Sequence, residues 1–323
     1  MKKNLFRGMI SLIVLIGCGK DENIEDAIFN NSSNNDSLGA AKTEEAEKTE
    51  IKYTTYFLTE KNKDSLFKKF DSLYTKDQMY SILALNRLDQ ANRWRADTLV
   101  IPSLIDSTLM AYSPFPKHIA LLKDVKKFVT FSYPIQAYGV YSNGKLVKWG
   151  PTSMGKKVAK TKTGLMFTNW KKELAISTVN KSWKLPYNFN VHNTLGIGWH
   201  QYDLPGYPAS HSCLRLLMDD AKWMYSYADQ WILSKGGATI RAKGTPVLIF
   251  GEYGWGKAKP WKHLEENPKG MDISEEELTE LLNPHLQMIL LEQSNREKVL
   301  QELAVEKEKA IVKSALIPEK SAE

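Results

Sequence analysis

Cysteine and long hydrophobic runs are scarce in this sequence. Only two of its 323 residues are cysteine, Cys18 and Cys213, so a fold held together by several disulfides is excluded. The apolar stretch near the start, residues 9–16, is too short to span a bilayer. No internal repeat is visible, which excludes a repeat architecture.

Composition allows a folded protein with a sizeable core, because 42% of the residues are hydrophobic. The length fits one large domain or two modest ones. The net charge of +7 would suit nucleic acid, a membrane surface or an anionic wall polymer. The lysines are scattered rather than clustered with aromatic residues, so we expect a general compositional bias and no nucleic-acid partner.

The first residues have the pattern of an export signal. A basic segment (Lys2, Lys3, Arg7) precedes the apolar run, which ends in Leu15-Ile16-Gly17-Cys18. This ending resembles the lipobox of bacterial lipoproteins and predicts a signal peptide at 1–17 and a lipid on Cys18; an ordinary signal peptide with an incidental cysteine is the alternative. The chain is then expected on the periplasmic face of a membrane. Gly19 is not the aspartate typical of inner-membrane retention, so the outer membrane is favoured.

Two regions precede the part of the chain that carries the chemistry. Residues 18–50 are polar and predict a disordered tether. Residues 51–116 have helical patterns at 64–74 and 78–88. Residues 82–102 resemble the second half of a LysM carbohydrate-binding module, although its first half is not recognisable. The alternative is a small helical subdomain packed on the rest of the protein.

The pattern of residues 127–251 is mostly that of β-strands. Strands are predicted at 136–142 and 145–150 on either side of Asn143-Gly144, a strong hairpin signal, and at 164–169, 174–178 and 245–251. One helix is predicted at 221–233, capped by Asp219 or Asp220 and ended by Gly236-Gly237.

Residues 252–323 predict a helical extension. Ser274 begins a capping box, Pro284 is expected to break the first helix, and 285–316 reads as one long charged helix. We expect this helix to pack along its own molecule; a partner-binding helix is the alternative.

Residues 198–216 combine residue types that suit nucleophilic catalysis. Cys213 lies beside His211 and downstream of His200. An imidazole can take the proton of a thiol and leave a thiolate–imidazolium pair, which Arg215 would favour further. Taken alone, each of these residues is as well explained by a buried structural cysteine or a hydrogen-bonded histidine.

The stretch Leu204 to Leu216, which contains Ser210-His211-Ser212-Cys213-Leu214-Arg215, resembles the active-site signature of the L,D-transpeptidases, the YkuD-like catalytic domain. Residues 153–156, 161–164 and 244–247 resemble further elements of that family. The resemblance implies an α+β protein. Its catalytic domain at 127–251 is mostly a β sandwich, between the N-terminal helical, LysM-like segment and the C-terminal helical extension.

The resemblance also implies residue roles. Cys213 matches the nucleophile and His200 the general base, which the Gln201 carbonyl would orient. His211, Ser212 and Cys213 match the oxyanion hole, and Arg215 braces the loop or contacts a substrate carboxylate. His192 is a second candidate base or part of the donor groove, and Tyr207 and Trp199 are candidate groove residues. Ser212 replaces the usual glycine. The Cβ of a serine at this position is tolerable only if φ is negative.

The implied reaction is acyl transfer on peptidoglycan. Cys213 forms an acyl-enzyme from a tetrapeptide stem and passes it to an amine. Water as acceptor (an L,D-carboxypeptidase) and a catalytically weak wall-binding lipoprotein are the alternatives. The expected partners are stem peptides and a membrane, with no metal and no cofactor; the sequence does not fix the oligomeric state.

Overall fold

The structure is a computed structural model that describes residues 50–315. The predicted signal peptide, the lipidation site Cys18 and the predicted tether up to residue 49 lie outside the described residues. Within residues 50–315, no helix is both long enough and apolar enough to cross a membrane.

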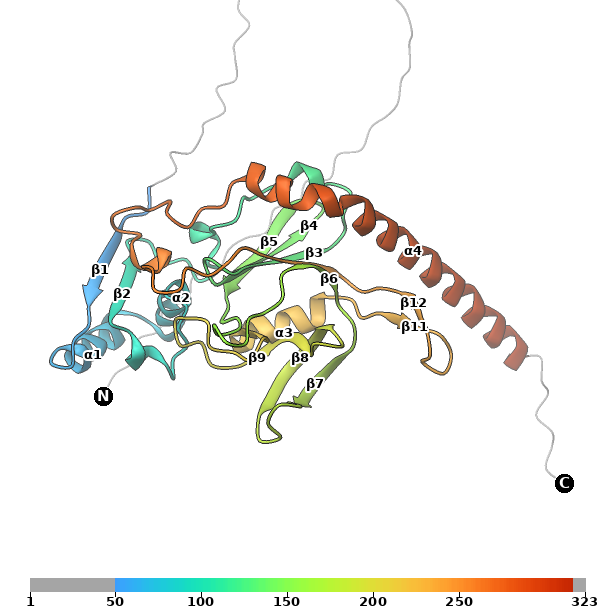
Figure 1. Ribbon diagram of the computed structural model, residues 1–323, viewed down its shortest axis with the longest axis horizontal. Coiled ribbons are helices and arrows are strands. Elements are labelled where there is room, and N and C mark those ends of the chain that lie inside the picture. Colours follow the sequence, from blue (N-terminus) through green and yellow to red (C-terminus); the bar gives the residue numbers. More distant parts are fainter. Residues whose placement is uncertain (1–49, 316–323) are drawn as a thin grey trace, which may run out of the picture. The chain divides into compact units, whose positions relative to one another are not determined.

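The N-terminal module, residues 50–102, is a β-α-α-β unit (Figure 1). Strand β1 (Tyr53–Phe57) pairs antiparallel with β2 (Thr98–Pro102), and α1 (Lys63–Leu73) and α2 (Lys76–Leu85) lie between them in sequence. Thr75 and Gln78 form a capping box that starts α2. The two helices were predicted, whereas β1 was not; a carbohydrate-binding role for the module stays a prediction.

Two β-sheets make up the centre of residues 127–251. The first has the order β5-β4-β3-β13-β6, and the second has the order β10-β9-β8-β7. The strands of the first sheet are β3 (Phe128–Ser132), β4 (Ala137–Ser142), β5 (Lys145–Pro151), β6 (Gly164–Phe167) and β13 (Pro246–Phe250). The strands of the second are β7 (Lys171–Ile176), β8 (Lys184–His192), β9 (Ile197–Gln201) and β10 (Leu214–Leu216).

The sheets share one buried cluster. Phe131 of β3 stacks on Trp199 of β9 at 6.2 Å between ring centroids, and Trp199 also contacts Phe189 of β8 at 5.1 Å. The predicted Asn143-Gly144 hairpin is present, with φ of 48° and 76°, as a two-residue turn between twisted strands requires. The mixed α+β architecture with mostly β catalytic sheets confirms the predicted fold class.

Helix α3 (Met218–Tyr227) is shorter than predicted. Ile232–Leu233 forms β11, which pairs with β12 (Ile240–Ala242), so Gly236-Gly237 lies in that hairpin and does not end the helix. The predicted cap is also wrong, because the N-cap is Leu217 and makes no side-chain bond. Asp220 instead turns inward and forms a buried ion pair with Lys148 at 2.8 Å.

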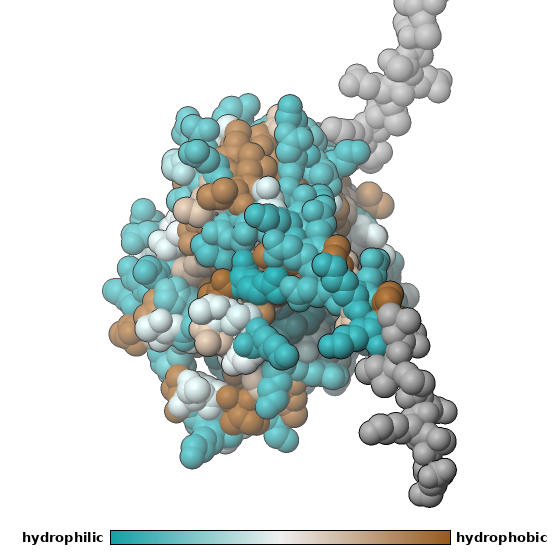
Figure 2. All heavy atoms as spheres, turned by 90° about the vertical axis from the view of Figure 1, so that its right-hand side faces the viewer, coloured by the Kyte–Doolittle hydropathy of each residue, from teal (hydrophilic) through white to brown (hydrophobic). Residues whose placement is uncertain are grey.

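Helix α4 (Glu275–Ala315) contains Pro284 without ending there, so the predicted break is wrong. The helix continues because Leu282 and Ile289, on either side of the proline, are both buried in the core. Packing on both sides holds the chain helical although Pro284 donates no hydrogen bond. Residues 304–313 are exposed throughout, so the last part of α4 lies outside the core. On the face toward the end of α4, hydrophobic residues form separate patches among hydrophilic ones (Figure 2).

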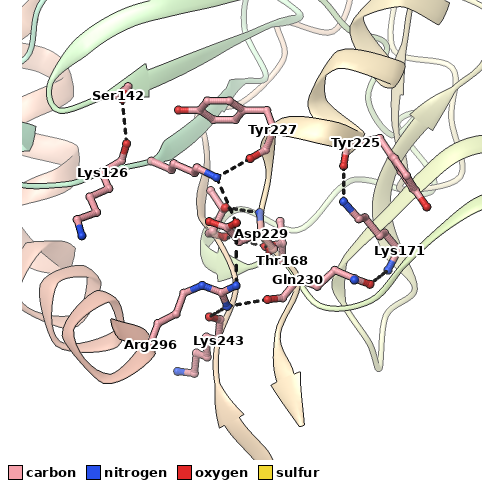
Figure 3. Close-up of polar contacts among 12 residues, drawn as sticks. Lys126, Ser142, Thr168, Lys171, Tyr225, Tyr227, Asp229, Gln230, Lys243 and Arg296 are labelled. Atoms are coloured by element: carbon pink, nitrogen blue, oxygen red, sulfur yellow. Dashed lines mark hydrogen bonds and ion pairs between the residues drawn. The ribbon is translucent and has the colours of Figure 1, made fainter. Parts of the chain in front are cut away.

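Polar contacts fix the middle of α4 to the segments just before β11 and just after β12 (Figure 3). Arg296 donates to the carbonyls of Gln230 at 2.7 Å and Lys243 at 3.0 Å. Its guanidinium also faces Asp229, which forms an ion pair with Lys127 at 3.1 Å. One carboxylate thus lies between two cations from different elements, so this part of the extension belongs to the catalytic body. The remaining short helices are η1 (Arg93–Arg95), η2 (Met110–Tyr112), η3 (Ala120–Leu122) and η4 (Pro260–Lys262).

Arg87, at the end of α2, joins three parts of the molecule. Its side chain is fully buried, and its guanidinium lies over the rings of Trp149 and Trp261 at 5.6 and 5.1 Å. It donates to the carbonyls of Leu85 and Ile135 at 2.7 and 2.9 Å. The N-terminal module, the first sheet and the C-terminal extension therefore meet around one buried cation.

Candidate active site

The pairing of β9 and β10 places the candidate residues on one face. The strands are parallel, with Arg215 opposite His200 and Leu214 opposite Trp199. Because side chains alternate along a strand, Trp199 and Leu214 point into the core, where both are fully buried. His200 and Arg215 point the other way, and Cys213 lies two residues before Arg215. The alternation of apolar and functional residues in both segments therefore produces the site.

His200 is buried and held by the backbone. Its Nδ1 lies 2.9 Å from the carbonyl oxygen of Gln201, the contact that was expected. Because a carbonyl oxygen only accepts, Nδ1 carries the proton and Nε2 is left as the acceptor. Burial lowers the pKa of His200 to about 4; the carbonyl acts in the opposite direction, and the charge of Arg215 lowers the pKa further.

Cys213 is partly exposed, and its Sγ lies 3.8 Å from the carbonyl oxygen of Gly196. Burial raises the pKa of the thiol, while the Gly198 backbone and Arg215 oppose the rise. The depressed pKa of His200 and the raised pKa of Cys213 both favour the neutral forms at rest, because both groups have lost solvent that would stabilise their charges. The thiolate–imidazolium pair stays a prediction.

The loop before Cys213 is braced from two sides. Ser153 donates its hydroxyl to the Tyr207 carbonyl at 2.7 Å and accepts from the Ala209 amide at 3.1 Å. On the other side, the N-terminal module contributes Asp89, whose carboxylate accepts from the Leu204 amide at 2.7 Å. Residues 153–156 (Ser153-Met154-Gly155-Lys156, a Ser-x-Gly-Lys element) thus support the loop. The support from Asp89 was not predicted, because nothing in the sequence links residues 115 positions apart.

Ser212 adopts a φ of 84°, in the region that favours glycine. The negative φ that a serine was expected to need at this position is therefore not present. The turn is fixed because the Ser212 carbonyl accepts from Thr161 Oγ1 at 2.9 Å and the Cys213 carbonyl accepts from Ser210 Oγ at 2.5 Å. Among the described residues, nothing accepts from the amides of Ser212 and Cys213. A positive φ in such a turn lets successive amides face a single anion, so the serine keeps the shape that glycine would give.

His211 contacts Lys156, the last residue of the Ser-x-Gly-Lys element. Lys156 Nζ lies 2.8 Å from His211 Nε2, and the ring of Trp183 lies 5.1 Å from that of His211. Burial and the charge of Lys156 lower the pKa of His211. A neutral His211 is thus oriented beside Cys213, with Nε2 accepting from the ammonium group.

A cavity of about 40 Å³ joins these groups. His200, His211, Cys213 and Arg215 all line it. Its other walls come from β9, the segment before Cys213 and the β7–β8 hairpin: Tyr202, Ser210, Ser177, Val179, Trp183 and Leu185. The sequence showed Trp183 and Tyr202 only as two of many aromatic residues near the motif, and nothing in it distinguished them from core residues.

Three predicted substrate-binding residues do not line this cavity. Trp199 is fully buried in the shared core, so its predicted role is wrong. His192 lies at the end of β8, where its Nδ1 accepts from the Leu195 amide at 3.3 Å. Tyr207 lines a separate cavity beside Lys259. Within residues 50–315, no cluster of three His, Cys, Asp or Glu side chains has an arrangement that could hold a metal ion.

Comparison with known proteins gives a family for this region. Residues 126–249 match the family model described as YkuD, the L,D-transpeptidase catalytic domain. No curated protein matches the chain.

Several solved L,D-transpeptidases are similar to part of the chain. One from Stackebrandtia nassauensis is 25% identical, over 40% of this chain and 57% of that chain, with a TM-score of 0.33. L,D-transpeptidase 1 from Mycobacterium tuberculosis is 20% identical, over 39% and 62%, with a TM-score of 0.30. An Enterococcus faecium enzyme is 22% identical, over 39% and 50%, with a TM-score of 0.30. In each case the chain spans less than two thirds of the solved chain. The family match confirms the resemblance found in the motif, and residues 126–249 are an L,D-transpeptidase catalytic domain of the YkuD family.

Proposed function

We propose that the protein is a peptidoglycan L,D-transpeptidase in which Cys213 is the nucleophile and His200 the general base. The observation that carries this proposal is the β9–β10 register, which puts His200 and Arg215 opposite each other at a cavity that Cys213 also lines. The family match of residues 126–249 supports the reaction class. The substrate would be a tetrapeptide stem, and the acceptor an amine.

Acylation begins from the neutral pair. His200 Nε2 takes the proton of the thiol as Sγ attacks the carbonyl carbon before the terminal D-residue. The negative charge that develops on the carbonyl oxygen is stabilised by the amides of Ser212 and Cys213. The carbon–nitrogen bond then breaks, His200 returns its proton to the leaving amine, and a thioester on Cys213 remains.

The second half returns the enzyme to its starting state. An acceptor amine attacks the thioester carbon and loses a proton to His200 Nε2. The carbon–sulfur bond breaks, and the departing thiolate takes that proton back from the imidazolium.

The test is product analysis by mass spectrometry with purified protein and a tetrapeptide stem. Release of the terminal D-residue together with a cross-linked product is expected from the wild type, and Cys213→Ala should give neither. Release without cross-linking would make the protein an L,D-carboxypeptidase. No release by the wild type would favour a wall-binding role without catalysis.

We further propose that a lipid on Cys18 anchors the catalytic domain to a membrane, with the outer membrane favoured. The support is the lipobox-like run that ends at Cys18 in the sequence. Several acyl chains would make such an attachment stable.

A further inference from the structure

A small cavity beside the loop of residues 205–207 is lined by several cationic side chains. Its volume is about 70 Å³. The lining comes from three parts of the chain: residues within 86–98 of the N-terminal module, residues 205–207 before the candidate nucleophile, and Lys259 and Lys262 of the C-terminal extension. Neither Cys213 nor His200 lines this cavity, so the proposed reaction gives it no role.

The charged groups in the lining are three cations and one carboxylate. Arg95, Lys259 and Lys262 carry the positive charges, and Asp97 carries the negative one. Asp97 is already engaged, because it forms an ion pair with Lys262. Three positive charges and one negative charge leave a net charge of +2, for which the lining offers no counterion.

The ammonium group of Lys259 is half-buried and has no polar partner. It lies 5.4 Å from the ring centroid of Tyr207, and among residues 50–315 no group accepts a hydrogen bond from it or pairs with it. Burial lowers the pKa of Lys259 and the charge of Lys262 lowers it further, while Asp97 acts in the opposite direction. An anion in the cavity would replace the water that this ammonium group has lost.

Arg95 also has hydrogen-bonding capacity left over. Its side chain is exposed, and its Nε donates to Asn92 Oδ1 at 2.8 Å. Within the described part of the chain, neither terminal nitrogen of the guanidinium group donates to another residue. These nitrogens form a planar fork that suits an oxyanion.

We propose that this cavity binds a phosphate monoester group carried by a larger molecule. Such a group has a charge of about −1.5 to −2 at pH 7, which matches the net charge of the lining. A carboxylate or a phosphodiester has a charge of only about −1 and would leave one cation unpaired. A space of this size holds several water-sized groups, which is room for one tetrahedral oxyanion. Asp97 and Tyr207 are exposed, so the cavity opens at the surface and the rest of the ligand can stay outside.

The proposal does not depend on the proposed function, and binding tests it without any turnover. The full chain is titrated by calorimetry at pH 7 and constant ionic strength. The probes are inorganic phosphate, glycerol phosphate and a short-chain phosphatidic acid, with dimethyl phosphate and acetate for comparison. Both esters should bind at least about tenfold more tightly than dimethyl phosphate or acetate. The ester that binds more tightly identifies a soluble or a lipid source.

Variants assign the binding to this cavity. Lys259→Met should weaken binding of glycerol phosphate at least about tenfold, whereas Lys259→Arg keeps the cation and should weaken it less. Lys257→Met is the matched control, because it removes the same charge from an exposed lysine outside the lining and should leave the affinity nearly unchanged. Asp97→Asn should tighten binding several-fold, because it removes the only carboxylate in the lining. If circular dichroism shows that Lys259→Met is unfolded, Arg95→Met takes its place.

Four results would overturn the inference. They are no binding of either ester by the wild type, equal affinity for dimethyl phosphate, equal loss in Lys257→Met and Lys259→Met, and weaker binding in Asp97→Asn. Binding of inorganic phosphate without either ester would overturn the assignment to a larger molecule.

Discussion

Ser212 holds a backbone conformation that a serine adopts at a cost, so Ser212→Gly should stabilise the protein. The φ of 84° lies outside the regions that are sterically favourable for a residue with a Cβ. The turn cannot relax, because Thr161 donates to the Ser212 carbonyl and Ser210 to the Cys213 carbonyl. Glycine can keep the same turn and both contacts, since neither uses the serine side chain.

The magnitude follows from two opposing effects. A non-glycine residue in this region is strained by about 2 kcal/mol. Glycine makes the unfolded chain more flexible, which costs about 0.8 kcal/mol. The net gain in the free energy of unfolding should be about 1 kcal/mol, which raises the melting temperature of a domain of this size by about 3 °C.

The assay is thermal unfolding at pH 7, followed by circular dichroism. Ser226→Gly is the matched control, because Ser226 is an exposed serine within α3. There glycine should lower the free energy of unfolding by about 0.5 kcal/mol, since it weakens a helix. The reasoning is refuted if Ser212→Gly lowers the melting temperature as Ser226→Gly does.

Three further predictions concern other contacts. Because the pKa of His200 falls from 6.5 to about 4 on folding, the unfolded chain binds a proton in this pH range that the folded protein does not. The free energy of unfolding should therefore fall as the pH drops from 6.5 to 4, and the loss should reach about 3 kcal/mol below pH 4. Urea titrations of His200→Gln should lack this loss. Asp89→Ala should lower the free energy of unfolding, measured in urea, by about 2 kcal/mol, because the buried Leu204 amide loses its acceptor. Asp89→Asn keeps one side-chain oxygen and should lower it by less. Equal losses in the two variants would contradict this interpretation. Cys18→Ala should move the protein out of the membrane fraction, and a variant that stays wholly membrane-bound would exclude lipidation as the anchor.

Local signals in the sequence predicted much of the fold. The Asn143-Gly144 turn and the helix of residues 63–73 depend on neighbouring residues, and both are present. Pro284 and the end of α3 were predicted wrongly because packing decided them. Leu282 and Ile289 are buried on either side of the proline, and Ile232–Leu233 pairs with β12 in place of extending the helix.

The candidate site, like the fold, was predicted from the sequence only where local patterns decide it. Cys213, His200, His211 and Arg215 lie in one short motif, and one cavity contains all four. Trp199 was assigned wrongly, because the strand alternation that points His200 toward the cavity points the neighbouring Trp199 into the core. The contribution of Asp89 depends on the docking of two distant segments, which no local pattern encodes.

The nucleophile assignment is tested most directly by trapping the acyl-enzyme. A carbapenem is a strained acyl donor, so the wild type should gain the mass of one molecule, and peptide mapping should place it on Cys213. His200→Ala should acquire the adduct more slowly near pH 7, because the thiol has a raised pKa and has lost its base. Cys213→Ser should remain largely unmodified. An unmodified wild-type mass after prolonged exposure, or an adduct on any residue other than Cys213, would contradict the assignment.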